Sequence, residues 1–211
     1  ADLWARCQLQ LASAHRALAN YDAAVQAYHE AEIAFLSIDD VVRAAHCMLG
    51  RAHIARRRRD AKTAARLIDE VRIELTQAGA RAGVAASLHA RAEVHRMNGE
   101  LDAAEDAYRE ARERYTHIGS PKSVWVELDL ATVLIVRKNF LEADLLLQRA
   151  LQAAMTQGRR ILELKARANL VVCAAHSKDW HAWDGHMQQI EMIVGETRAA
   201  DIDVAQQIAV S

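Results

Sequence analysis

A stretch of sequence that recurs about every 40 residues limits what this chain can fold into. Residues 21–35 (YDAAVQAYHEAEIAF) match residues 101–115 (LDAAEDAYREARERY), 80 positions later. Weaker copies begin at residues 61, 140 and 180, so the successive offsets are 40, 40, 39 and 40. Within each copy, apolar residues are spaced 3, 4, 3 and 4 apart, which places them on one stripe of an α-helix. The sequence therefore predicts five copies of one helical unit.

The stripes share a composition in which small and large apolar residues alternate. Their residues are Tyr21, Ala24, Tyr28, Ala31 and Phe35; Ala61, Ala64, Ile68, Val71 and Leu75; Leu101, Ala104, Tyr108, Ala111 and Tyr115; Phe140, Ala143, Leu147, Ala150 and Ala154; and Trp180, Trp183, Met187, Ile190 and Val194. The repeated alanine at the second position lets two helices approach closely. Trp183 replaces it in the fifth copy, where a bulkier seam is expected.

A second helical pattern precedes each stripe, at about residues 3–17, 42–57, 82–97, 122–137 and 161–176. Four stripes directly follow a residue whose side-chain oxygen can cap a helix N-terminus, namely Asn20, Asp60, Asn139 and Asp179. The joints between units contain Asp39, Asp40, Gly79, Gly119 and Gly158. Alanine supplies 43 residues, against 8 glycines and one proline, and this composition favours helices. Each unit is expected to be an antiparallel pair, helix A followed by helix B.

The expected fold is all-α: a right-handed α-solenoid of five helix–turn–helix repeats plus a C-terminal helix, with no sheet. It forms a single array over residues 1–211. The repeats cover about residues 1–40, 41–80, 81–120, 121–159 and 160–195, and residues 196–210 form the terminal helix, either as a cap or as the start of a sixth repeat. Because the chain starts at Ala1 without a methionine or a signal-peptide pattern, we expect a fragment of a longer protein.

The unit resembles the tetratricopeptide (TPR) repeat over nearly the whole chain. The family's small–large–small pattern in helix B corresponds to Ala24, Tyr28 and Ala31, and to Ala104, Tyr108 and Ala111. In helix A its pairing of a large and a small residue corresponds to Leu11-Ala12 and Leu130-Ala131, and its Gly-Asp turn to Gly99-Glu100.

The sequence also departs from the TPR pattern. Its unit has about 40 residues instead of 34, arginine replaces the expected leucine at Arg51 and Arg91, and the closing proline is missing. These features resemble the long-repeat TPR variety of bacterial regulators, signalling ATPases and protease-associated sensor regions.

The resemblance implies that the A helices line a concave groove that binds a peptide or a partner's helix. Transferred position by position, the groove-lining residues are Arg6, Gln10, Ser13, Arg16, His46, Gly50, His53, Arg56, His89, Glu93, Arg96, Trp125, Asp129, Thr132, Lys165, Asn169 and Val172. The expected function is a scaffold for protein–protein interaction. The alternative is a regulatory or sensor region of a multidomain bacterial signalling protein (an ATPase, kinase, protease or transcription regulator), which acts on an effector domain of its own chain.

Charge gives a hint about the partner. Arg16, Arg56 and Arg96 recur at 40-residue intervals, so they could form a ladder that holds an acidic protein segment. The alternative is that they are solvated residues near the C-terminal ends of A helices, where positive charge is favourable. Residues 41–60 are rich in arginine, but no aromatic residue lies among the arginines and the net charge is −1, so nucleic acid is disfavoured as a partner.

Other classes of function lack a motif. There is no phosphate-binding glycine loop, nucleophile elbow, HExxH or CxxC motif, so neither an enzyme nor a cofactor or metal site is expected. Ten histidines, including His181 and His186 beside Trp183, show no ligand spacing. Cys7 and Cys47 occupy the same repeat position and are interpreted as buried and unbridged. No apolar run could span a membrane, and the expected location is the cytoplasm.

Overall fold

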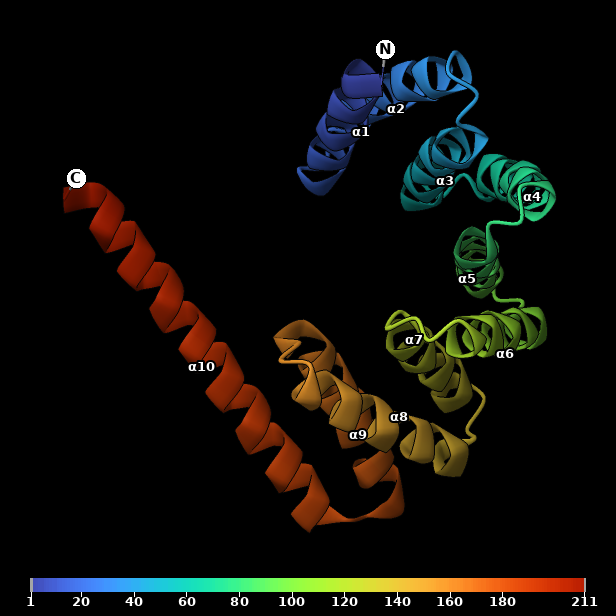
Figure 1. The fold of residues 1–211 in the computed structure, drawn as a ribbon. Coiled ribbons are helices and arrows are strands. Elements are labelled where there is room, and N and C mark those ends of the chain that lie inside the picture. The colour runs from blue at the N-terminus through green and yellow to red at the C-terminus, as the bar shows by residue number, and fades with distance from the viewer. Residues whose placement is uncertain (1, 211) are drawn as a thin grey trace. The chain divides into compact units, whose positions relative to one another are not determined.

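The computed structural model describes the backbone of residues 2–210 and the side chains of residues 2–196. Over that backbone it contains ten helices and no strand (Figure 1). The A helices are α1 (Asp2–Ala17), α3 (Val41–Arg57), α5 (Arg81–Met97), α7 (Ser123–Val136) and α9 (Arg160–Ser177). The B helices are α2 (Tyr21–Leu36), α4 (Ala61–Gln77), α6 (Leu101–His117), α8 (Phe140–Thr156) and α10 (Trp180–Val210). The predicted all-α fold of helix–turn–helix repeats is confirmed.

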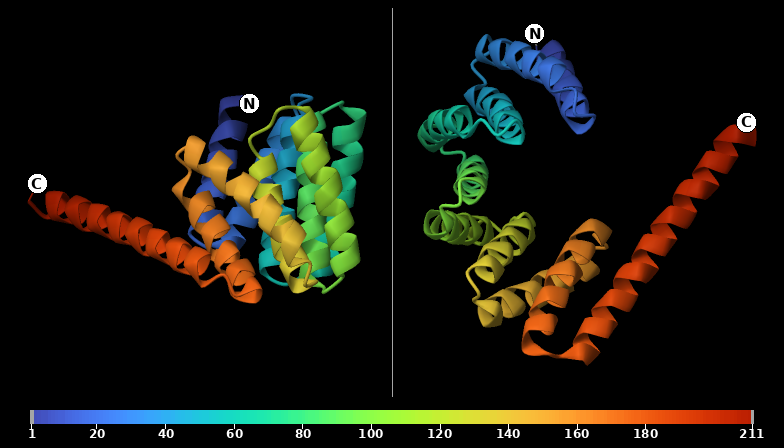
Figure 2. Two further views of the ribbon diagram at one scale, coloured as in Figure 1. Left: turned by 90° about the horizontal axis from the view of Figure 1, so that it is seen from below. Right: turned by 180° about the vertical axis from the view of Figure 1, so that it is seen from behind.

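The helices form two compact units, Ala1–Ser123 and Val124–Ser211. In the first unit α1, α3 and α5 contact one another in succession on one side, with α2, α4 and α6 on the other (Figures 1 and 2). In the second unit α9 packs against both α8 and α10. The structure differs from expectation at residues 196–210. Instead of a separate terminal helix they continue α10, because no turn or capping bond interrupts the backbone after the fifth stripe.

One turn type closes every joint between successive helices in residues 2–210. A residue with φ near +60° to +80° is followed by a residue whose N–H donates to a carbonyl five positions earlier, as in Asn20 to His15 (2.8 Å). This is the Schellman arrangement, which satisfies carbonyl groups at the end of a helix. Glycine holds the left-handed position at Gly79, Gly99, Gly119 and Gly158, and other residues hold it at Ala19, Asp39, Arg59, Lys138 and Lys178.

Only some of the predicted caps are formed by side chains. Asp60 accepts from the N–H of Thr63 (3.0 Å) and Asp179 from that of Ala182 (3.0 Å). Asn20 and Asn139 make no such bond to the helix that follows. The Asn139 amide instead donates to the side chain of Glu142 (2.9 Å).

The stripes of the first four B helices form the core. The residues from the second to the fifth stripe position of α2, α4, α6 and α8 are each at most 3% exposed. The fifth stripe departs from this pattern: Val194 is 50% exposed, and its neighbour Ile193 is buried instead. Trp183, Met187 and Ile190 are only partly buried. The bulky seam predicted at Trp183 is therefore incomplete, because α10 turns a different face toward α9.

The cysteine interpretation is half right. Cys47 is buried in α3, but Cys7, at the same position in α1, is exposed. The difference follows from packing. Helix α2 of the preceding hairpin covers α3, whereas no helix among the described residues covers the equivalent face of α1.

The departures from the TPR pattern at Arg51 and Arg91 have a structural explanation. Arg51 of α3 pairs with Glu32 of α2 (2.6 Å), and Arg91 of α5 pairs with Asp69 of α4 (2.7 Å). Each arginine thus reaches back to the B helix of the preceding hairpin. An ion pair replaces the apolar contact that leucine would make.

Among the described residues, no helix has both the length and the apolar character needed to cross a bilayer.

Candidate functional site

The residues predicted to line a groove in the first unit gather on neighbouring A helices. We call Arg16, His53, Arg56, His89, Glu93 and Arg96 the first A surface. At its centre Arg56 of α3 donates to Glu93 of α5 (3.0 Å), and His53 Nδ1 lies 3.8 Å from the same carboxylate. These side chains are each at most one-third exposed. The pair therefore ties the A helices of two repeats together across this surface.

The recurring arginines make internal contacts. Arg16 Nε lies 3.2 Å from the hydroxyl of Tyr28, and Arg96 Nε lies 3.4 Å from the hydroxyl of Tyr108. Both tyrosines belong to helix B of the same hairpin as the arginine. Part of the 40-residue recurrence is thus explained by packing inside each hairpin.

Arg56 occupies the same repeat position but faces a different residue. The tyrosine of the other two hairpins is replaced by Ile68, which has no hydroxyl. Arg56 Nε is buried and has no hydrogen-bond partner in the described residues, while the guanidinium end turns to Glu93. A buried donor without an acceptor costs stability, so this position carries a local energetic penalty.

His53 stays neutral near pH 7. Burial, together with the positive charges of Arg56 and Arg16, lowers the pKa of His53 to about 3. Protonation of the imidazole would add a cation beside several arginines. Its contact with Glu93 is accordingly a polar contact rather than a full ion pair.

The other predicted residues of the first unit are spread more widely. Arg6, Gln10 and His46 are exposed, and Arg6 lies 3.9 Å from Asp2. His89 is partly buried and its ring stacks at a tilt on that of Tyr108, with centroids 5.7 Å apart. Gly50 is not available to a groove, because it is buried against the ring of Tyr28.

The second unit contains a comparable group, formed by Trp125 and Asp129 of α7 with Lys165 and Asn169 of α9, which we call the second A surface. Lys165 Nζ lies 3.5 Å from Asp129 and 5.3 Å from the centre of the Trp125 ring. The Asn169 amide donates to the hydroxyl of Thr132 (3.3 Å). As in the first unit, residues predicted from the resemblance connect two A helices.

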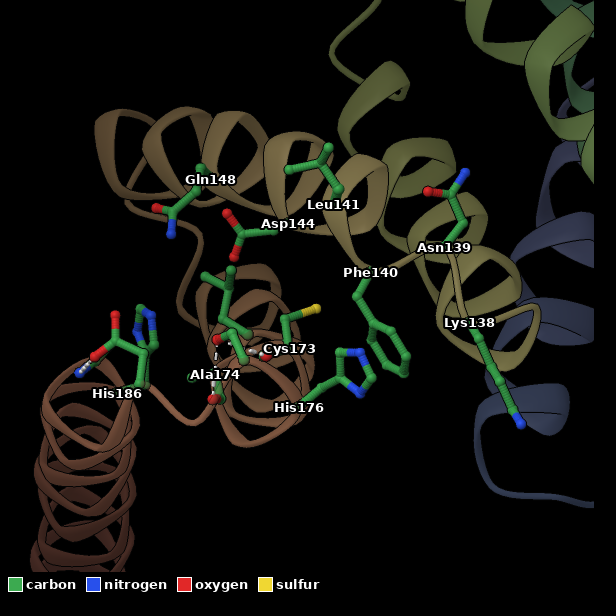
Figure 3. A pocket seen from close by; sticks show the side chains of 14 residues that line it. Lys138, Asn139, Phe140, Leu141, Asp144, Gln148, Cys173, Ala174, His176 and His186 are labelled. Atoms are coloured by element: carbon green, nitrogen blue, oxygen red, sulfur yellow. Dashed lines mark hydrogen bonds between the residues drawn. The ribbon is translucent and has the colours of Figure 1, made fainter.

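A hollow of about 550 Å³ lies elsewhere in the second unit, between α8, the end of α9 and the start of α10 (Figure 3). Its floor consists of Leu170, Cys173 and Ala174, each at most 7% exposed. At one end Phe140 and His176 stack, with ring centroids 3.7 Å apart. Asp144, Gln148 and His186 lie at the other end.

Little in the sequence points to this hollow. In the sequence His186 is one of ten histidines without ligand spacing, and Asp144 and Gln148 are polar residues of a predicted helix. Among the described residues no group of three His, Cys, Asp or Glu side chains could hold a metal ion.

No protein-family model and no curated protein matches the sequence. Solved structures do match the fold. BtubC (BKLC) from P. vanneervenii superposes with a TM-score of 0.76 and 16% identity, covering 89% of this chain and 78% of its own. A Rap conjugation gene regulator of the plasmid pLS20, in complex with the Phr* peptide, gives 0.77 and 16%, covering 90% and 52%. The chain has the TPR-like repeat fold.

A third TPR-like structure, a STAND signal transduction ATPase with a tetratricopeptide repeat sensor from Pyrococcus horikoshii, gives a TM-score of 0.78 at 16% identity. The match covers 92% of this TPR-like chain but 30% of the ATPase. At such identities the likeness concerns the fold, and the functions in the names of these proteins belong to them alone.

Proposed function

We propose that this TPR-like chain is a protein-interaction scaffold that binds a peptide or partner segment on its A helices. The observation that carries the proposal is the gathering of polar and aromatic side chains from successive A helices, as at Arg56 and Glu93 in the first A surface and at Lys165 and Trp125 in the second. Structural neighbours in complex with peptides, such as the Rap regulator with Phr*, support it.

An acidic partner segment fits the first A surface best. Arg16 and Arg96 are exposed residues, and the Nε atom of each contacts a tyrosine of its own hairpin. Glu93 pairs with Arg56 at the centre of this surface. Binding of an acidic segment should therefore weaken with salt, mainly through a slower association rate.

Site-specific photo-crosslinking tests the proposal. p-Benzoylphenylalanine placed at Gln10 and at Lys165, both exposed on A helices, should give partner adducts in the source cell. The same group at Lys62 and Asp106, exposed on B helices, serves as the matched control. Adducts from the B positions alone, or from all four positions equally, would contradict binding on the A helices.

The likeness to a STAND ATPase with a TPR sensor favours a second candidate function, a sensor region that acts on an effector domain of its own chain. In that case the Gln10 and Lys165 adducts would form within one polypeptide. Their mass on a denaturing gel distinguishes an intramolecular adduct from a captured partner.

A further inference from the structure

The hollow between α8, α9 and α10 has a polar end that the interaction surfaces do not use. Asp144 and Gln148 lie one turn apart on α8, and His186 faces them from α10 (Figure 3). Within the part of the chain whose side chains are described, these three form no hydrogen bond or ion pair. Three polar groups from two helices thus converge on one space and have no protein partner among the described side chains.

Each of these three groups can accept a hydrogen bond, although the Gln148 amide and the neutral His186 imidazole can also donate one. A carboxylate accepts only, an amide oxygen accepts, and a neutral imidazole has one acceptor nitrogen. Burial lowers the pKa of His186, and Arg167 lowers it further, although Asp144 and Asp179 oppose the shift. His186 is therefore neutral near pH 7. A ligand that supplies donors can use the acceptor atoms of all three side chains, and a positive charge on it would match Asp144.

The apolar floor of the hollow favours a ligand that also has an apolar part. Leu170, Cys173 and Ala174 present buried apolar surface next to the polar end. The volume of about 550 Å³ lies within the range of small-ligand sites. A ligand with a donor-rich cationic head and a short hydrocarbon stem would contact both parts.

We propose that this hollow binds a primary ammonium group on a short unbranched carbon chain, held by Asp144, Gln148 and His186. An ammonium group has three donors, one for each of the three side chains. A lysine side chain of a partner and a free alkylamine share this chemistry. The site is separate from both A surfaces and does not depend on the proposed scaffold function.

Titration of labelled protein followed by NMR tests the proposal, with the Gln148 side-chain amide and the His186 imidazole as reporters. The probes are n-butylammonium, N-acetyl-lysine methylamide and, as the uncharged control, n-butanol. We expect saturable shifts with a charged probe and none with butanol. Response to butylammonium identifies a free amine as sufficient, whereas response to the lysine derivative alone identifies a partner's side chain as the source. No saturable shift with either, or equal binding of butanol, would overturn the proposal.

Variants locate the site. Asp144→Asn removes the charge without changing shape and should weaken binding at least about tenfold, since charge-assisted hydrogen bonds exceed neutral ones by that order. Asp184→Asn is the matched control, because Asp184 is exposed on α10 and does not line the hollow. Circular dichroism and melting confirm folding first. If Asp144→Asn is unstable, Gln148→Leu at an exposed position of the rim takes its place. Unchanged affinity of the folded variant for the charged probes would contradict binding of the ammonium group in this hollow.

Discussion

At the scale of single residues, packing between hairpins depends on which side chain meets which. A Cβ added at Gly50 would lie 2.5 Å from Cζ of Tyr28, whose ring is only 3% exposed. Glycine is required there by close approach, although its φ is ordinary for a helix. In the next repeat Ile68 occupies the position of Tyr28, and Ala90 occupies the position of Gly50. The large residue is thus smaller there and the small residue is larger.

Two glycine substitutions should therefore act in opposite directions. Gly50→Ala should destabilise the protein by about 1–3 kcal/mol, because the packed Tyr28 ring must move. Gly185→Ala meets nothing within 4 Å in helix α10 and should stabilise it by about 0.5–1 kcal/mol. Denaturant unfolding of both variants measures the difference. Stabilisation by Gly50→Ala would show that the Tyr28 ring can move aside without a loss of packing free energy.

His53 makes stability depend on pH in a defined direction. Because burial lowers its pKa to about 3, the folded protein releases a proton that the unfolded chain binds below about pH 6.5. The stability that depends on neutral His53 is therefore fully present above about pH 6.5. The free energy of unfolding decreases as the pH falls from there toward 3. The melting temperature of wild type should drop more between pH 7.5 and 5 than that of His53→Gln. Equal drops would mean that His53 titrates normally in the folded state.

At the scale of elements, a single turn type sets the length of every joint. Four joints have glycine at the left-handed position, where it adopts positive φ without strain, and five do not. At the non-glycine joints the same Schellman bonds hold the backbone in place, for example from Asp60 N–H to the Ala55 carbonyl (2.9 Å).

The joints offer a matched pair of substitutions. Ala19→Gly should stabilise the protein by about 0.5–1 kcal/mol, since the left-handed strain of alanine exceeds the flexibility cost of glycine. Gly119→Ala should destabilise it by about 1 kcal/mol through backbone strain alone, because a Cβ there meets no atom within 4 Å. Thermal melts of the two variants should shift in opposite directions. A shift of the same sign in both would exclude backbone conformation as the cause.

At the scale of the whole molecule, stability comes from contacts between neighbouring hairpins. In the first unit α2 packs on α3 and α4 on α5, and Arg51 and Arg91 add ion pairs across those same seams. Repeat arrays of this kind behave as sums of units and nearest-neighbour interfaces.

A shortened chain should consequently fold on its own. Residues 1–120 contain three hairpins of the first unit, the minimum for a stable array. We expect a strongly helical circular dichroism spectrum and a cooperative melt, and as a control the isolated hairpin 41–80 should be largely unfolded. An unfolded 1–120 fragment would show that the first unit depends on residues beyond it.

The first nine helices are predictable from the sequence to within a few residues, because a stripe spaced 3, 4, 3 and 4 apart determines the helix and, in the first four B helices, its buried face. The resemblance to TPR repeats also identified side chains on adjacent A helices, such as Arg56 and Glu93, since one repeat position recurs on the same surface. These features are local or periodic, and periodicity can be read directly from the residues.

Tertiary structure decided what depends on neighbours distant in sequence. Arg51 departs from the repeat pattern because it pairs with Glu32, 19 residues earlier, across the seam between two hairpins. Ile193 replaced Val194 in the core because the contact with α9 sets the rotation of α10. The hollow at Asp144 and His186 exists because three helices pack around it. Periodic burial fixes each helix by itself, whereas the free energy of contacts between helices selects which side chains meet.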